Sequence, residues 1–204
     1  MIDAVDAEML QQCGIRYLGF PLRLPVHSQD LTEQEVAAII KSLAPPVFGV
    51  LISYLDEASE IAAFCHALGA RIVQLHGDIN CGELKRLKTL DPNLTVIKSL
   101  VIGMHDDKAL EAMVSELSPF VDAFITDTLD PKAGHSAPTG KTHDWRVSRR
   151  LVELADKPVI LAGGLTPENV KRAILEVRPA GVDSHTGVED SSGRKKTPKR
   201  SGVE

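Results

Sequence analysis

Residue types that suit acid–base chemistry and anion binding recur directly after short apolar runs of this sequence. They are His27, His76, Asp78, Lys98, Asp127, the pair Gly163-Gly164 and the run Ser184-His185-Thr186-Gly187. Aspartate and histidine side chains donate and accept protons in many enzymes. Glycines allow backbone N–H groups to come close to an anion. Together these residues predict a site that moves protons on a small, negatively charged substrate.

Two glycine-containing turns predict where the negative charge binds. Gly163-Gly164 and Thr186-Gly187 each follow an apolar run late in the chain. Backbone N–H groups at such turns attract anions, more so where a helix begins. We therefore assign phosphate binding to Gly163, Gly164, Thr186 and Gly187. The alternative is that the glycines only supply the positive φ of a tight turn.

The elements that must position these residues alternate between strand and helix. Short apolar runs predict seven strands, at residues 17–20, 47–54, 71–75, 94–102, 120–126, 158–162 and 181–183. Between them, apolar residues at helical spacing predict helices such as 33–43 and 110–117. Thr32 with Glu35 predicts a capping box, and Thr166-Pro167 predicts another helix start. This alternation is typical of a parallel sheet, and seven strands favour a (β/α) barrel.

The two ends of the chain depart from a regular barrel. Residues 3–12 have helical spacing, so the chain opens on a helix with no strand before it. Residues 191–204 are polar and basic and lack the apolar stripe of a normal last helix. We therefore expect one barrel domain at residues 1–190 and a basic, solvated tail at 191–204. The strands at 17–20 and 181–183 are expected to form open edges.

Composition limits the classes of partner. Net charge is −5 and aromatic residues make up 4% of the chain, which argues against nucleic acid binding. No apolar run approaches the length of a membrane span, and no secretory signal is visible. The three cysteines have no CxxC spacing, which is typical of reduced thiols. We expect a cytoplasmic protein, a monomer or homodimer, that acts on a phosphorylated small molecule without a cofactor.

Several motifs resemble those of the phosphoribosylanthranilate isomerase family, in family order, over about residues 15–196. They are Val73-Gln74-Leu75-His76-Gly77-Asp78, Asp127-Thr128, Thr139-Gly140-Lys141-Thr142-His143-Asp144-Trp145, Leu161-Ala162-Gly163-Gly164-Leu165-Thr166 and Gly181-Val182-Asp183. The resemblance implies a (β/α)8 TIM barrel, here missing strand 1 and most of the last helix. It also implies an Amadori rearrangement of N-(5-phosphoribosyl)anthranilate in tryptophan biosynthesis.

The resemblance implies roles for individual residues. Asp127 of the Asp-Thr motif corresponds to the general acid that protonates the ribose ring oxygen. The family's substrate-binding arginine has no match here, and Arg23 or His27 could replace it. We also assign His76 and Lys98 to substrate binding, and no residue to a metal ion.

The general base is not identified in this chain. The family carries its catalytic cysteine on the first strand, in a sequence similar to Lys-Ile-Cys-Gly-Ile. Cys13-Gly14-Ile15 resembles that motif but follows the opening helix. That position corresponds to a turn on the far side of the barrel, so we do not assign Cys13 as the base.

Two other functions remain open. The chain could be a barrel isomerase or epimerase acting on another sugar phosphate, with His27, His76, Asp127 and His185 at its mouth and a metal ion in place of the thiol. It could also be a barrel that binds a phosphorylated ligand without catalysis. Turnover of N-(5-phosphoribosyl)anthranilate distinguishes the isomerase of the resemblance from these two alternatives. Metal analysis of the purified protein distinguishes the two alternatives from each other.

Overall fold

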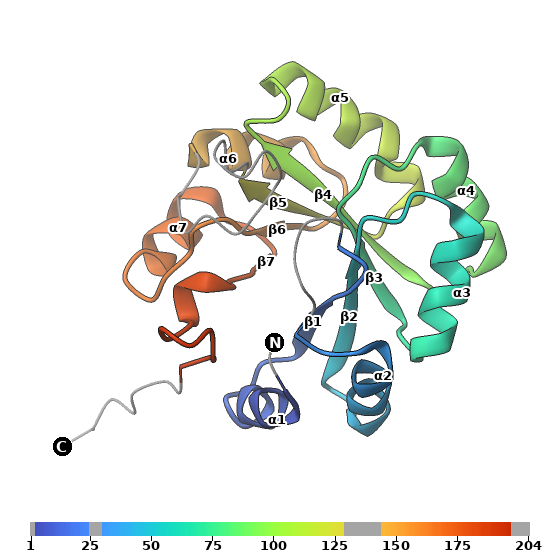
Figure 1. The fold of residues 1–204 in the computed structure, drawn as a ribbon. Helices are drawn as coiled ribbons and strands as arrows, with labels where there is room; N and C mark the ends of the chain where they lie inside the picture. Colours follow the sequence, from blue (N-terminus) through green and yellow to red (C-terminus); the bar gives the residue numbers. More distant parts are fainter. Residues whose placement is uncertain (1–2, 25–29, 129–143, 197–204) are drawn as a thin grey trace.

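Seven parallel strands form one curled sheet in the computed structural model, which describes residues 3–24, 30–128 and 144–196 (Figure 1). Each strand pairs with the next one along the chain, in the order β1 to β7. The strands are β1 (Tyr17–Pro21), β2 (Phe48–Ser53), β3 (Ile72–Leu75), β4 (Thr95–Ile102), β5 (Ala123–Thr128), β6 (Val159–Leu161) and β7 (Gly181–Val182). The seven predicted strands are therefore confirmed. Sequential parallel pairing with helical crossovers is the architecture of a (β/α) barrel.

Helices cover the outer side of the sheet (Figure 1). They are α1 (Ala4–Gln12), α2 (Glu33–Ser42), α3 (Ala58–Leu68), α4 (Cys81–Leu90), α5 (Asp107–Leu117), α6 (Trp145–Leu154) and α7 (Val170–Val177), with 3-10 turns η1 (Ser118–Phe120) and η2 (Thr186–Val188). The predicted capping box is present: Thr32 and Glu35 bond to each other's backbone N–H at the start of α2. No helix in the described ranges is long and apolar enough to cross a membrane.

One predicted helix start is wrong. Thr166 does not cap α7, which begins at Val170. The Asn169 side chain instead accepts the Thr166 N–H at 2.9 Å and donates to the Gly164 carbonyl at 2.9 Å. Thr166 through Asn169 thus form a turn that holds the glycine loop after β6.

The curled sheet packs on both faces. Outward residues such as Leu51, Val73 and Val96 join the main core beneath the helices. Inward residues form a second, smaller cluster of Val50, Ile72, Ile97, Ile125 and Ala162. Because successive side chains alternate between faces, this division shows which polar residues face the inside of the curl.

The sheet does not close within the described residues. β1 and β7 each pair with one neighbour only, as expected from the sequence. Tyr17 of β1 is 60% exposed and stacks on Phe48 at 5.9 Å between ring centres. After β7, the described part of the chain contains only the 3-10 turn η2. The two edges therefore face each other without backbone pairing.

Side chains connect these two edges. Arg194, in the segment after β7, forms ion pairs with Asp3, the N-cap of α1, and with Asp6, whose side chain is only 4% exposed. The same segment forms a bridge between Glu189 and Lys195 and a hydrogen bond from the Lys196 N–H to the Val188 carbonyl. The first residues of the segment that we assigned to a tail are thus bound to the barrel.

Arg194→Ala is expected to lower the free energy of unfolding, because it leaves the buried Asp6 carboxylate with less compensation. Thermal unfolding should show a decrease in Tm of about 2–4 °C. The control is Arg146→Ala, since the Arg146 side chain is 91% exposed and its ion pair with Asp144 covers no buried charge. Equal Tm values for the two variants would show that the Arg194 link contributes nothing to stability.

Candidate active site

Three titratable side chains lie at the carboxyl ends of alternate strands, on the inner face of the sheet. His76 follows β3, Asp127 lies near the end of β5, and Asp183 follows β7. Asp127 shares its face with Ile125, a member of the inner cluster. Asp183 shares its face with Gly181, which pairs with the inner residue Ile160. Carboxyl ends of barrel strands are where catalytic residues are found in this architecture.

His76 and Asp127 form a close pair. The His76 Nε2 lies 3.6 Å from the Asp127 Oδ2, and the His76 side chain is 6% exposed. The Tyr54 ring packs edge-on against the imidazole at 4.7 Å. Gly77 allows this packing, since a Cβ there would lie 2.5 Å from the Tyr54 carbonyl oxygen. The imidazole is therefore held against Asp127 by the β2 and β3 ends.

The negative charge of Asp127 affects the titratable groups around it. Partial loss of hydration and the negative charge of Asp127 raise the pKa of Asp183, while the Lys195 charge lowers it. Asp183 nevertheless remains in contact with solvent. Burial and the Asp127 charge raise the pKa of Tyr54 to about 12. Groups perturbed by neighbours of this kind are typical of functional sites.

Two loops beside this cluster have the geometry of an anion site. Gly163 and Gly164 follow β6 with φ values of +95° and +64°, which favour glycine. Gly187 packs so closely on the Leu165 carbonyl oxygen that a Cβ would lie 1.9 Å from it. The Ser184 hydroxyl donates to the same oxygen at 2.7 Å. The loops after β6 and β7 are thus joined into one surface.

The backbone donors of this surface are available to a ligand. In the part of the chain that the structure describes, the N–H groups of Gly163, Gly164, Thr186 and Gly187 donate no hydrogen bond to protein. All four residues are half-buried. Backbone N–H groups need acceptors, and a phosphate supplies several at once. The geometry therefore supports the predicted phosphate role of these four residues.

Two residues that we assigned to substrate binding are engaged elsewhere. Lys98 lies on the outer face of β4 with Val96 and Leu100; it is 2% exposed, and its Nζ donates to the Ser99 carbonyl at 2.9 Å. Burial lowers the pKa of Lys98 to about 8, an effect opposed by the Asp78 charge. The hydrogen bond to Ser99 and the attraction to Asp78 do not direct the Lys98 ammonium group toward the His76–Asp127 pair.

Arg23 is occupied on the helix side. Its guanidinium pairs with Glu33 at 2.8 Å and Glu60 at 3.3 Å and lies over the Phe64 ring at 3.8 Å. His27 and residues 139–143 lie outside the described residues. The assignment of Arg23, His27 and Lys98 to substrate binding stays a prediction.

The three cysteines lie away from the inner face. Cys13 is the exposed C-cap of α1, as its position after the predicted helix implied. Cys65 is buried in α3, where burial raises its pKa to about 12. Cys81 begins α4 and bonds to Glu116, with a pKa raised by burial and by that contact. None of these thiols is placed to act on a ligand at the strand ends.

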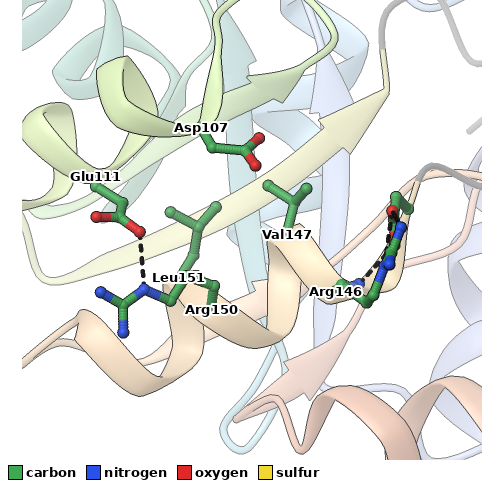
Figure 2. Close-up of a pocket in the computed structure, with 7 residues that line it drawn as sticks. Asp107, Glu111, Arg146, Val147, Arg150 and Leu151 are labelled. Atoms are coloured by element: carbon green, nitrogen blue, oxygen red, sulfur yellow. Dashed lines mark hydrogen bonds and ion pairs between the residues drawn. The ribbon is translucent and has the colours of Figure 1, made fainter.

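A hollow of about 290 Å³ lies elsewhere, between α5 and α6 in the helix layer (Figure 2). Figure 2 shows Arg150 paired with Glu111 beside Leu151, with Val147 further along the same helix, and the Arg150 Nε lies 2.7 Å from the Glu111 Oε1. The site at the strand ends is thus separate from this hollow. No group of three or more metal-ligating side chains occurs within residues 3–24, 30–128 and 144–196.

Two residues of the site escaped the sequence-based prediction, Asp183 and Tyr54. Asp183 had a signal, because it ends an apolar run in the Gly181-Val182-Asp183 motif. Tyr54 had a weaker one, as an aromatic residue directly after a predicted strand.

The parallel curled sheet, with polar groups at its carboxyl edge, defines an enzyme of the (β/α)8-barrel class. A family model described as N-(5'phosphoribosyl)anthranilate (PRA) isomerase matches residues 9–201, and the chain belongs to that family. Its function is that of an isomerase in tryptophan biosynthesis.

Individual relatives agree with this assignment. N-(5'-phosphoribosyl)anthranilate isomerase 2 of Methanosarcina mazei is 40% identical over 195 residues, which are 93% of this chain and 83% of the relative. The crystal structure of phosphoribosyl anthranilate isomerase from Thermotoga maritima is 27% identical, with a TM-score of 0.80 over 97% of this chain and 90% of that one. A further phosphoribosyl anthranilate isomerase, in complex with reduced 1-(o-carboxyphenylamino)-1-deoxyribulose 5-phosphate, shares the fold at 24% identity, with a TM-score of 0.77 over 97% and 89% of the two chains.

Proposed function

We propose that the carboxyl edge of the sheet catalyses the Amadori rearrangement of N-(5-phosphoribosyl)anthranilate, with Asp127 as the general acid. The observation that carries this proposal is the position of the His76–Asp127 pair, at 3.6 Å, beside four backbone N–H groups that have no acceptor in the described chain. The His76–Asp127 pair transfers a proton, and the four N–H groups bind the substrate's phosphate. One phosphorylated sugar spans both.

The geometry around Asp127 suits proton donation. Its Oδ1 accepts the Thr128 N–H at 2.8 Å, which fixes the rotation of the carboxyl group. Its Oδ2 faces the His76 imidazole. A proton on this carboxyl passes to the ribose ring oxygen, and the bond from C1 to that oxygen breaks as a Schiff base forms. Burial of His76 and the Tyr54 ring that packs on it limit the access of water to the pair.

The phosphate supplies binding energy and position. Gly163 and Gly164 at the end of β6, and Thr186 and Gly187 after β7, present their N–H groups on joined loops. The loops after the last two strands are the usual phosphate site of this barrel class. His76 contacts the sugar end of the substrate in this arrangement.

The test is turnover of N-(5-phosphoribosyl)anthranilate by the purified chain, compared before and after a metal chelator. We expect turnover that the chelator leaves unchanged. Turnover of another sugar phosphate only, lost with the chelator, would favour a divergent metal-dependent enzyme. Phosphate binding without any turnover would favour a ligand-binding barrel. Sedimentation of the same sample distinguishes the predicted monomer from the homodimer.

A further inference from the structure

One aromatic side chain borders the proposed site. In the part of the chain that the structure describes, Tyr54 is the only Phe, Tyr or Trp residue that directly follows a strand. It lies four positions after Val50, a member of the inner cluster, so the alternation of side chains along β2 directs it to the inner face. Its ring contacts the His76 imidazole edge-on, and Tyr54 as a whole is half-buried. Tyr54 therefore forms part of the wall of the site and keeps some surface for a ligand.

Hydrogen bonds on both sides hold the Tyr54 segment in place. The Leu55 N–H donates to the Ser53 hydroxyl oxygen at 3.3 Å. The Ala58 N–H, at the start of α3, donates to the Glu83 Oε2 of α4 at 2.7 Å. The turn between β2 and α3 is thus fixed before any ligand arrives. A side chain on such a turn loses little conformational freedom when a ligand packs against it.

Tyr54 and Asp127 border the same space, although β3 and β4 separate their strands in the sheet. Burial and the negative charge of Asp127 raise the pKa of Tyr54 to about 12. A charge acts in this way only on a group that lies near it. The phenol is therefore uncharged at neutral pH, and it does not repel a ligand that carries a carboxylate.

The groups along the carboxyl edge follow the order of the groups in the substrate. The phosphate loops follow β6 and β7, Asp127 lies on β5, His76 follows β3 and Tyr54 follows β2. N-(5-phosphoribosyl)anthranilate carries its phosphate on C5 of the sugar and its aryl ring on the nitrogen at C1. A substrate whose phosphate binds after β6 and β7, and whose sugar reaches Asp127, therefore extends its aryl ring toward the ends of β3 and β2.

We propose that Tyr54 recognises the anthranilate ring of the substrate, a role that rests on the proposed function. The phenol ring at the end of β2 packs edge-on or offset against the planar aryl ring. Aromatic pairs in these arrangements are more stable than apolar contacts of the same area. Tyr54 thus determines specificity, because it favours an N-aryl ribosyl phosphate over a sugar phosphate that has no ring.

The deciding experiment measures dissociation constants of two unreactive open-chain ligands by calorimetry. The aryl analogue is a 1-(2-carboxyphenylamino)-1-deoxypentitol 5-phosphate, and the aryl-free analogue is a 1-deoxypentitol 5-phosphate. Tyr54→Leu should raise the Kd of the aryl analogue about three- to tenfold, and the Kd of the aryl-free analogue by less than about twofold. Tyr54→Phe keeps the ring and should leave both Kd values at those of the parent chain.

Tyr17→Leu is the matched control. Tyr17 is the other tyrosine of the chain; it begins β1 at the amino end of the sheet, where it stacks on Phe48 and is 60% exposed. The same change there should leave both Kd values unaltered. Thermal unfolding shows whether each variant is folded. Tyr54→Ile takes the place of Tyr54→Leu if the latter does not fold, because β-branched residues suit the end of a strand.

The outcomes separate this proposal from the proposed function. If Tyr54→Leu weakens both analogues equally, or neither, the ring only supports His76 and its role in aryl recognition is overturned. A selective loss of the aryl analogue supports that role, and turnover by the parent chain then supports the proposed function as well. The same selective loss without turnover by the parent chain would leave the aryl site standing and overturn the proposed catalysis.

Discussion

Asp127→Asn is expected to reduce kcat by about 10²- to 10⁴-fold, because an amide keeps the shape of the carboxyl group but cannot deliver a proton. Asn can still accept the Thr128 N–H that Asp127 Oδ1 accepts at 2.8 Å. The fold around His76 should therefore survive the change. Steady-state kinetics with N-(5-phosphoribosyl)anthranilate, together with thermal unfolding, measure both expectations.

Asp156→Asn is the matched control for that experiment. Asp156 is exposed and precedes β6, so it lies at the amino end of the sheet, opposite the site. The same chemical change there should leave kcat and KM unaltered. If Asp127→Asn were as active as this control, Asp127 would have no part in proton transfer.

The strand order and the Asp127 site were predictable because their signals are local. Apolar runs such as residues 47–54 became β2, and helical spacing in residues 3–12 became α1. Parallel pairing then follows from the alternation of strand and helix. Once strand ends are located, Asp127 and His76 meet at one edge of the sheet, although they are 51 positions apart in the sequence.

The sequence of β4 does not show whether the Lys98 side chain lies on the inner or the outer face of the sheet. From Val96 to Ile102, β4 is buried on both sides, so its sequence carries no alternation of apolar and polar residues to show which face is which. Only pairing with Leu75 and Phe124, which both lie in the outer core, places Lys98 under the helices. Its assignment to substrate binding stays a prediction, because the sequence of β4 does not show which face carries Lys98.

Long-range side-chain contacts were also beyond the sequence. The Arg23 guanidinium meets Glu60, 37 positions away, and Arg194 meets Asp3, 191 positions away. Nothing in the local pattern links such residues, because the contacts exist only once α1, α2 and α3 are placed. The start of α7 moved for a local reason: the Asn169 side chain competes for the backbone of Thr166 and Gly164.

Gly164→Val is expected to raise KM by about 10- to 100-fold, which corresponds to losing one or two hydrogen bonds to a charged phosphate. A branched side chain at this position covers the backbone N–H that the phosphate approaches. It also disfavours the φ of +64° that the loop requires. KM for the substrate and the inhibition constant of inorganic phosphate should rise together, while kcat falls by a smaller factor.

Backbone strain alone is measured by a second variant, Gly69→Val. Gly69 has a similar φ of +73°, caps α3, and has nothing within 4 Å of an added Cβ, so its strain is felt far from the site. Both variants should lose stability by comparable amounts, since both force a branched residue into the left-handed region. Only Gly164→Val should weaken phosphate inhibition. Equal KM values for the two variants would mean that Gly164 serves the turn alone and that the phosphate binds elsewhere on the barrel.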